Sequence, residues 1–440
     1  MQRVKITVIT FFLIMFVLCV VFSSCKTANI TSSAGRSASV SSDVKHDSRA
    51  FVTIEEIPIM AWFGVQEHTI DRYHELKEAG INYNFTYYPN VEVLATAMDA
   101  ANTAGVRMII HCPELETETE KIVNRFINYP ALAGYYLRDE PISNDFPHLG
   151  ELARRIQAID NNHYCYINLF PNYASPEQLG IPTYLEYVQS FLKEVPVQFL
   201  SFDHYPIRSY AGVRSLYSGW YENLEIISDE ACKAGIPFWA FALTIAHHPY
   251  PIPTLADLRL QVYSNLAYGA QGIQYFTYWT TDPLVYNDCP IGSDGKKTDI
   301  WYKVQQMNRE IKALSKVFLS AQVIKVEHIA TNASGENADI PIATTRFDFA
   351  NRPAEASIIK KFAIPNNTNA LVSFLKNGNR AYMVIVNKNL EGGDNVTFTI
   401  KGSPGLQLIK KDGKAVSAFF QSSKQTVTPG DVLIYGWNVK

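Results

Sequence analysis

The stretch Gly134–Pro141, GYYLRDEP, runs from an aromatic segment into three charged residues and a proline. Asp139 and Glu140 are neighbouring carboxylates, which can hold, donate or accept protons, and Arg138 places a cation beside them. The same charges could begin a solvated loop, or Arg138 and Glu140 could form a salt bridge. The choice depends on the element that ends at this point and on what lies near it.

Other residues with reactive or ring-stacking side chains also follow short apolar runs. Carboxylates can protonate a leaving group or attack an anomeric carbon, while Tyr and Trp rings stack on sugar rings. Aromatic residues are abundant, at 12% of the chain, although protein cores use them too. The residues concerned are Trp62, Tyr87, His111, Asn168, Asp203, His204, Tyr205 and Trp279. A fold that gathered them around Glu140 would hold the groups that sugar cleavage requires.

The apolar runs recur at a regular interval and are predicted to be strands. Between them lie segments with apolar residues at three- and four-residue intervals, such as 69–80 and 255–271, which predict amphipathic helices. Gly105 and Gly235 stand where two of these helices should end. The predicted strands are Ile57–Val65, Asn82–Pro89, Val106–Pro113, Ala133–Pro141, His163–Pro171, Val197–Pro206, Ile236–Thr244 and Gly272–Thr280.

Strands alternating with helices predict a parallel sheet covered by helices, and eight such units predict a closed (β/α)8 TIM barrel over residues 51–320. No glycine-rich phosphate loop follows any strand in the sequence, which disfavours an open nucleotide-binding sheet. In a barrel, the carboxyl ends of all strands form one face. Because Asp139 and Glu140 end the fourth strand, we expect them at this face, beside residues from other strands.

Residues 321–440 follow a different pattern, with period-two alternation and no helical segment between the alternating runs. Asn377-Gly378 is a hairpin signal between two such runs, and the segments 395–402 and 430–437 add further strands. We therefore expect a small all-β sandwich domain that packs against the barrel.

The barrel resembles the clan of (β/α)8 glycoside hydrolases that includes β-galactosidases and cellulases. Members of this clan place an acid/base glutamate at the end of strand four, a His-Tyr pair near the end of a later strand, and a Trp after strand eight beneath the sugar. Glu140, His204-Tyr205 and Trp279 stand at matching places in this sequence. The resemblance implies a glycoside hydrolase that acts on an oligosaccharide or polysaccharide without a cofactor, with Glu140 as general acid/base.

One position departs from this clan. Its nucleophile is a glutamate at the end of strand seven, and no carboxylate stands between Phe238 and His248 here. In one interpretation Asp203, on strand six, is the second carboxylate. In another it is Asp139, orienting a substrate acetamido group as in β-N-acetylhexosaminidases, which requires a kink at the strand end because neighbouring residues normally point apart. In a third, the protein binds glycans without catalysis.

The distance between the Glu140 and Asp203 carboxyl groups would separate these interpretations. About 5 Å indicates a retaining mechanism and roughly 6.5–9.5 Å an inverting one, whereas a larger gap favours the acetamido-assisted or binding-only interpretations. Strand alternation puts Arg138 on the side of Glu140, where it would lower the pKa of Glu140 or contact a substrate carboxylate. The other expected substrate-binding residues are Trp279, His204, Tyr205, Asn168, Tyr87, Trp62 and His111. His247-His248 lacks a clear third ligand, so no metal site is expected.

The N-terminus reads as a bacterial lipoprotein signal over residues 1–25. A basic start precedes an apolar run and then FSSC, in which Cys25 would be lipidated and become the mature N-terminus. A flexible, Ser-rich tether follows over residues 26–50. The predicted location is outside the cytoplasm, anchored to a bacterial membrane. With a net charge of −3 the chain has no basic face for nucleic acid.

Overall fold

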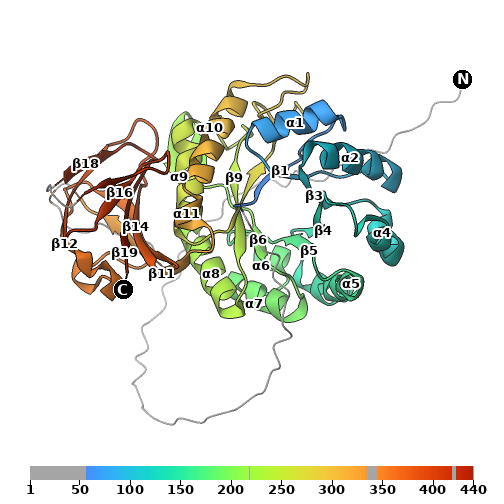
Figure 1. Ribbon diagram of the computed structural model, residues 1–440. Helices are drawn as coiled ribbons and strands as arrows, with labels where there is room; N and C mark the ends of the chain where they lie inside the picture. The colour runs from blue at the N-terminus through green and yellow to red at the C-terminus, as the bar shows by residue number, and fades with distance from the viewer. Residues whose placement is uncertain (1–55, 218, 333, 335–343, 419–422, 440) are drawn as a thin grey trace, which may run out of the picture. The chain divides into compact units, whose positions relative to one another are not determined.

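Eight parallel strands form a closed barrel in the computed structural model (Figure 1). The structure describes residues 56–217, 219–332, 334, 344–418 and 423–439. Their order is β5-β4-β3-β2-β1-β10-β9-β6. The ring closes where the Leu169 N–H donates to the Ser201 carbonyl at 2.9 Å, joining β5 to β6. The strands are β1 (Ile59–Trp62), β2 (Tyr83–Phe85), β3 (Arg107–Ile110), β4 (Leu132–Asp139), β5 (Tyr164–Asn168), β6 (Leu200–Phe202), β9 (Phe238–Leu243) and β10 (Gly272–Phe276).

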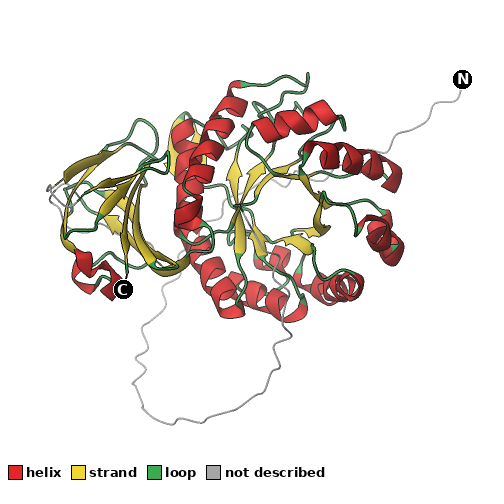
Figure 2. Cartoon of the chain, in the orientation of Figure 1, coloured by secondary structure: helices red, strands yellow, loops and turns green. Residues whose placement is uncertain are grey.

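Helices surround this ring of strands, as Figure 2 shows. Their ends follow local signals: the Thr183 and Thr254 side chains cap two N-termini, and Gly105 ends a helix with a left-handed φ of 68°. The helices are α1 (Ile70–Glu78), α2 (Val91–Ala104), α3 (Glu114–Thr117), α4 (Thr119–Phe126), α5 (Phe146–Ile159), α6 (Pro176–Leu179), α7 (Tyr184–Glu194), α8 (Gly219–Ala234), α9 (Leu255–Ala267), α10 (Asp299–Ala313) and α11 (Ser315–Phe318). The predicted TIM barrel is confirmed, and its strands are shorter than the apolar runs from which they were predicted.

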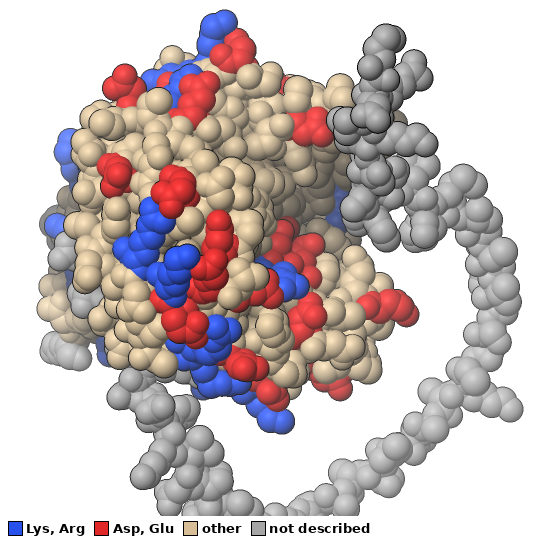
Figure 3. Space-filling model, turned by 90° about the vertical axis from the view of Figure 1, so that its right-hand side faces the viewer, with Lys and Arg blue, Asp and Glu red and all other residues tan. Residues whose placement is uncertain are grey.

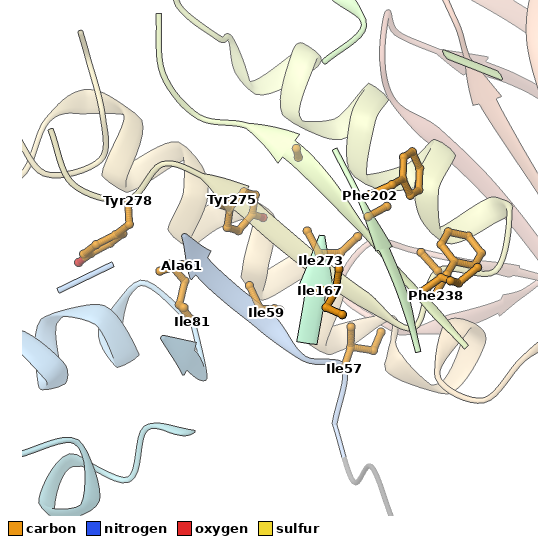
Figure 4. Packing of buried hydrophobic residues seen from close by; sticks show 14 of the residues in the cluster. Ile57, Ile59, Ala61, Ile81, Ile167, Phe202, Phe238, Ile273, Tyr275 and Tyr278 are labelled. Carbon is orange, nitrogen blue, oxygen red and sulfur yellow. The ribbon is translucent and has the colours of Figure 1, made fainter. Parts of the chain in front are cut away.

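Strand alternation divides the barrel core into two layers. On β1, Ile59 and Ala61 face the helices, in the outer core seen in Figure 4, while Met60 and Trp62 face the barrel interior. The interior layer is strongly aromatic, because most of its other members are Tyr, Phe or Trp. They include Tyr83, Phe85, Tyr136, Tyr164, Tyr166, Phe199, Trp239 and Phe241. Bulky rings therefore fill the barrel beneath its mouth.

A two-stranded hairpin follows the sixth barrel strand at the same end of the barrel as the carboxyl terminus of β6. Its strands are β7 (Ile207–Tyr210) and β8 (Val213–Leu216), joined by a two-residue turn. Backbone bonds fix it at two points: the Ser209 N–H donates to the Pro249 carbonyl at 2.7 Å, and the Tyr217 N–H donates to the Pro206 carbonyl at 2.7 Å.

Two antiparallel sheets follow the barrel. The larger has the order β11-β13-β14-β19-β16-β17 and the smaller β12-β15-β18. The hairpin at Asn377-Gly378 forms as expected, with Asn377 paired to Arg380 across the turn. The strands are β11 (Gln322–Ala330), β12 (Ile359–Ala363), β13 (Asn369–Asn377), β14 (Arg380–Asn387), β15 (Val396–Gly402), β16 (Gln407–Ile409), β17 (Ala415–Ser417), β18 (Ser423–Val427) and β19 (Val432–Asn438). The predicted all-β fold of this region is confirmed.

Helix α9 belongs to both cores. It packs on β9 and α10 of the barrel and also on β13 and β14 of the sandwich, and nearly all of its residues are buried. Leu371, Val384 and Ile434 of the sandwich lie in the same apolar cluster as the barrel helices. The Ser373 hydroxyl donates to the Ala267 carbonyl at 2.7 Å, at the C-terminal end of α9.

Charged residues on the outer helices lie in mixed-sign pairs. Arg125 on α4 bonds Glu92 on α2, and Arg155 on α5 bonds Glu120 on α4. Figure 3 shows basic and acidic side chains interspersed on this side of the molecule. No helix among the described residues is long and apolar enough to cross a membrane. The predicted signal, Cys25 and the tether lie outside the described residues.

Candidate active site

The end of β4 is irregular, and this irregularity sets the directions of its charged residues. A bulge interrupts the β4–β5 register between Tyr136 and Arg138, and Glu140 adopts a left-handed φ of 42°. Tyr136 faces the barrel interior, whereas Arg138 lies 3.9 Å from Glu116 and 3.8 Å from Asp145. The expectation that simple alternation pairs Arg138 with Glu140 is therefore wrong.

Instead, the kink turns both neighbouring carboxylates toward the barrel mouth. Glu140 lies beside Asp203, which follows β6, close enough for the two carboxyl groups to interact. The Asn168 amide nitrogen, at the end of β5, donates to Asp139 Oδ1 at 3.1 Å and to Asp203 Oδ1 at 3.0 Å. Tyr205 also lies near Asp203 and acts on its pKa. Three carboxylates from two strands thus meet around one amide, which brings together five of the residues singled out from the sequence.

Burial at the barrel mouth raises the pKa of each of these acids. Burial raises the pKa of Glu140 well above its usual range, and the negative charges of Asp203 and Asp139 raise it further. Burial and the charge of Asp139 raise the pKa of Asp203, against the bonds from Asn168 and Tyr205. Asp139 retains solvent contact, yet partial desolvation at the mouth raises its pKa to about 6, with the Asn168 bond opposing the shift. These shifts favour the protonated form of Glu140 beside Asp203.

A buried polar chain fixes the orientation of the central amide. Gln274 on β10 donates to the Ser201 hydroxyl at 2.8 Å, and Ser201 donates to Asn168 Oδ1 at 2.9 Å. The Tyr166 hydroxyl donates to Gln274 Oε1 at 2.6 Å. Since the Asn168 oxygen already accepts from Ser201, its NH2 group must point at the carboxylates. Ser201 and Gln274 were missed in the sequence, where buried amides and hydroxyls on strands resemble ordinary core residues.

Tyr87 and His111 lie at the rim, next to the carboxylates. The Tyr87 hydroxyl is 2.9 Å from that of Tyr136, and burial raises the pKa of Tyr87 to about 12, with the charge of Asp139 adding to the shift. The His111 ring lies 5.3 Å from the Tyr87 ring. Tyr87 remains 41% exposed, so its ring is accessible at the mouth.

Three other expected sugar-binding residues are buried and turned elsewhere. Trp62 lies in the barrel interior, against Phe85 at 4.5 Å. Trp279 is 5% exposed and packs beneath Arg72 at 5.1 Å, in the outer core. His204 is 1% exposed, and its Nδ1 lies 3.1 Å from the Asn223 side chain. Neither Trp offers a free ring face to a sugar, and His204 lies behind the mouth rather than on it.

Other aromatic residues take the places expected for the tryptophans. Phe276, the last residue of β10, is partly exposed and lies 5.5 Å from the Tyr205 ring and 5.7 Å from the Tyr286 ring. Tyr173 and Tyr250 also lie near Asp203: burial raises the pKa of both hydroxyls, and the charge of Asp203 adds to each shift. The sequence interpretation chose Trp279, near the end of the predicted strand, whereas β10 ends three residues earlier, at Phe276. The loop positions of Tyr173 and Tyr250 carry no periodic signal.

Metal ligands do not gather at the mouth. Within the described ranges, no group of three or more His, Cys, Asp or Glu side chains is placed to hold a metal ion. Cys112, Cys165 and Cys289 are buried thiols and Cys232 is an exposed one, all of them free. The polar side chains that the described residues place at the mouth are carboxylates, an amide and phenols.

No protein-family model matches the chain, and no curated protein matches it significantly. Solved structures do match at low identity. A GH30 endoxylanase from Clostridium papyrosolvens C71 aligns at 10% identity and a TM-score of 0.46, over 88% of this chain and 98% of that one. An α-L-arabinofuranosidase from Thermotoga maritima aligns at 9% identity and a TM-score of 0.47, over 84% and 90%. A glucosidase from Croceicoccus marinus aligns at 10% and 0.44, over 88% and 96%. Likeness at this level says nothing of the activity of this chain.

Proposed function

We propose that this protein is a glycoside hydrolase in which Glu140 is the general acid. The observation that carries this proposal is the placement of Glu140 beside Asp203 at the barrel mouth, where Asn168 donates to both Asp203 and Asp139. A general acid must still be protonated at working pH, and burial beside two carboxylates provides this. Phe276 and Tyr87 supply ring faces at the same mouth.

We infer that Asp203 is not the second catalytic carboxylate, because it lies directly beside Glu140 and accepts a hydrogen bond from Asn168. Glu140 and Asp203 act as one proton-sharing pair. Asp139 is then the second carboxylate, because it is exposed at the mouth and is ionised above a pKa of about 6. It serves as nucleophile, as base, or as the group that orients a substrate acetamido group.

The same proposal includes a location. A lipid on Cys25 and the Ser-rich tether over residues 26–50 would hold the barrel outside the cytoplasm at a bacterial membrane, where glycans are met. Labelling with radioactive palmitate in cells, with Cys25→Ser as the comparison, tests this part separately.

Glu140→Gln tests the catalytic assignment. Loss of the transferable proton should lower kcat by about a hundredfold or more on a substrate found by screening aryl glycosides and polysaccharides. The variant also removes a carboxyl group from a crowded site, so its Tm should not fall. Arg138→Gln is the matched control at the neighbouring position and should retain activity. Wild-type turnover by Glu140→Gln would contradict the proposal.

A non-catalytic glycan-binding protein is the second candidate. It is favoured by the end of β9, where Thr244 and Ile245 are buried and no carboxylate stands opposite Glu140. In that case the purified protein should bind oligosaccharides with an affinity that Glu140→Gln leaves intact. It should also release no reducing ends from any oligosaccharide that it binds.

A further inference from the structure

Arg208 lies on the β7–β8 hairpin, at the edge of the candidate active site. Its side chain stacks on two rings, with the guanidinium carbon 4.2 Å from the Tyr217 ring centre and 5.3 Å from that of Tyr173. Since the hairpin is itself anchored at Ser209, the guanidinium is held in place before any ligand arrives.

This guanidinium has unused hydrogen-bonding capacity. Arginine has five N–H donors, and the buried Nε of Arg208 has no partner. In the part of the chain that the structure describes, no carboxylate lies within ion-pair distance of Arg208. The two nearby comparisons differ: Arg214 on the same hairpin pairs with Asp257, and Arg138 at the same mouth pairs with Glu116 and Asp145.

Tyr173 and Tyr250 connect Arg208 to the carboxylates. Burial raises the pKa of Tyr250, the charge of Arg208 opposes this shift, and the charge of Asp203 adds to it. Burial raises the pKa of Tyr173, and the charges of Asp203 and Glu140 add to this shift. The Tyr250 ring lies 5.8 Å from the Tyr205 ring, which follows Asp203 in the chain. The two tyrosines thus lie between Arg208 and the carboxylates.

We propose that Arg208 makes the site selective for a sugar that carries an anionic group, a carboxylate or a sulfate. The inference rests on the proposed function, since it names the substrate class of that same site. Three acids at the mouth would repel an anionic sugar, so a glycan of this class needs one fixed cation. A planar guanidinium meets a carboxylate or sulfate through two parallel hydrogen bonds.

Binding to the Glu140→Gln protein tests this selectivity without requiring turnover. The probes are tetrasaccharides of matched length: an oligogalacturonide, a sulfated galactan and a neutral galactan. Titration calorimetry at low salt should show at least one anionic probe binding about tenfold to a hundredfold more tightly than the neutral one. The galacturonide and sulfated arms distinguish a carboxylate from a sulfate ligand.

The second variant is Arg208→Gln in the same background. It should remove the preference for the anionic probe while leaving the affinity for the neutral one unchanged, whereas Arg138→Gln should retain the preference. Equal affinity for neutral and anionic probes, or a preference that survives Arg208→Gln, would overturn the inference. If anionic probes bind through Arg208, yet the wild-type protein cleaves neither these probes nor any other glycan, the proposed hydrolase function fails while this inference stands.

Discussion

Asn168 is the residue on which the candidate site depends. It donates to Asp139 and to Asp203, and the chain from Gln274 through Ser201 prevents its amide from turning over. A free asparagine could present either its oxygen or its nitrogen to the acids. Here only the nitrogen is available, so the amide favours the ionised form of Asp139.

Replacing Asn168 should therefore move the pH dependence of activity. Without this donor, the pKa of Asp139 rises from about 6. The acidic limb of the kcat/KM profile of Asn168→Ala should therefore move to higher pH. The measurement is the full pH profile on the screened substrate.

Asn172→Ala is the control, since Asn172 follows the same strand and its side-chain amide donates to the Gly219 carbonyl rather than to the acids. It can lower stability but should leave the acidic limb in place. An unshifted limb in Asn168→Ala would show that this amide does not tune Asp139.

At the scale of elements, the β7–β8 turn decides how firmly Arg208 is presented. Tyr210 pairs with Val213, which leaves Ala211 and Gly212 as the turn, with φ of 50° and 79°. Both angles are left-handed, as in the turns that best match hairpin twist. Ala211 adopts this conformation against its own preference, whereas Gly212 adopts it without strain.

Substitutions in this turn should act on the hairpin alone. A Cβ at position 212 would meet no atom within 4 Å, so Gly212→Ala costs about 1 kcal/mol through backbone strain only. Ala211→Asn should have the opposite effect, because Asn accepts a left-handed φ more readily. Hydrogen exchange of the Ser209 amide, which bonds Pro249, reports the change. Equal exchange rates in the two variants would show that the turn does not limit the stability of the hairpin.

Elements were predictable from the sequence where periodic patterns specify them, and the site was predictable only in part. The eight apolar runs and the Asn377-Gly378 signal placed the strands, and the barrel then brought Glu140, Asn168 and Asp203 to one face. The direction of Arg138 was not predictable, because it follows from a bulge that alternation does not encode. The hairpin that carries Arg208 was also missed, because each of its strands has only four residues. An alternating pattern of that length on either side of Ala211-Gly212 is too short to recognise.

At the scale of the whole molecule, a buried polar relay joins the barrel to the sandwich. Lys388 lies 3.1 Å from His328 Nδ1, His328 Nε2 lies 2.8 Å from the Tyr268 hydroxyl, and Tyr268 donates to Glu225 at 3.2 Å. Burial lowers the pKa of Lys388 to about 7 and raises the pKa of Glu225 to about 7. The two ionisable groups thus lie at opposite ends of one hydrogen-bonded chain, across the domain interface.

Stability should depend on pH through Lys388. Between pH 7 and its usual pKa of 10.5, the lysine is neutral in the folded protein but protonated in the unfolded chain, so wild-type stability rises with pH in this window. Lys388→Met lacks this rise. The difference in unfolding free energy, variant minus wild type, should therefore fall as pH increases from 7 to 10.

Urea unfolding at several pH values measures this difference, and Lys361→Met, at an exposed position on β12, is the control. A constant difference across the window would mean that Lys388 keeps an ordinary pKa. The loss of a partner for His328 changes the size of the difference but not its slope.

Because α9 is covered by the barrel on one side and by the sandwich on the other, this helix is a structural part of both domains. A truncated protein that ends after the last barrel helix would expose the apolar side of α9 that the sandwich covers, and an exposed apolar surface of this kind promotes aggregation. Recombination that exchanges the sandwich for another domain must therefore preserve the matching side of α9. The barrel therefore cannot be transferred to another protein as an independent module.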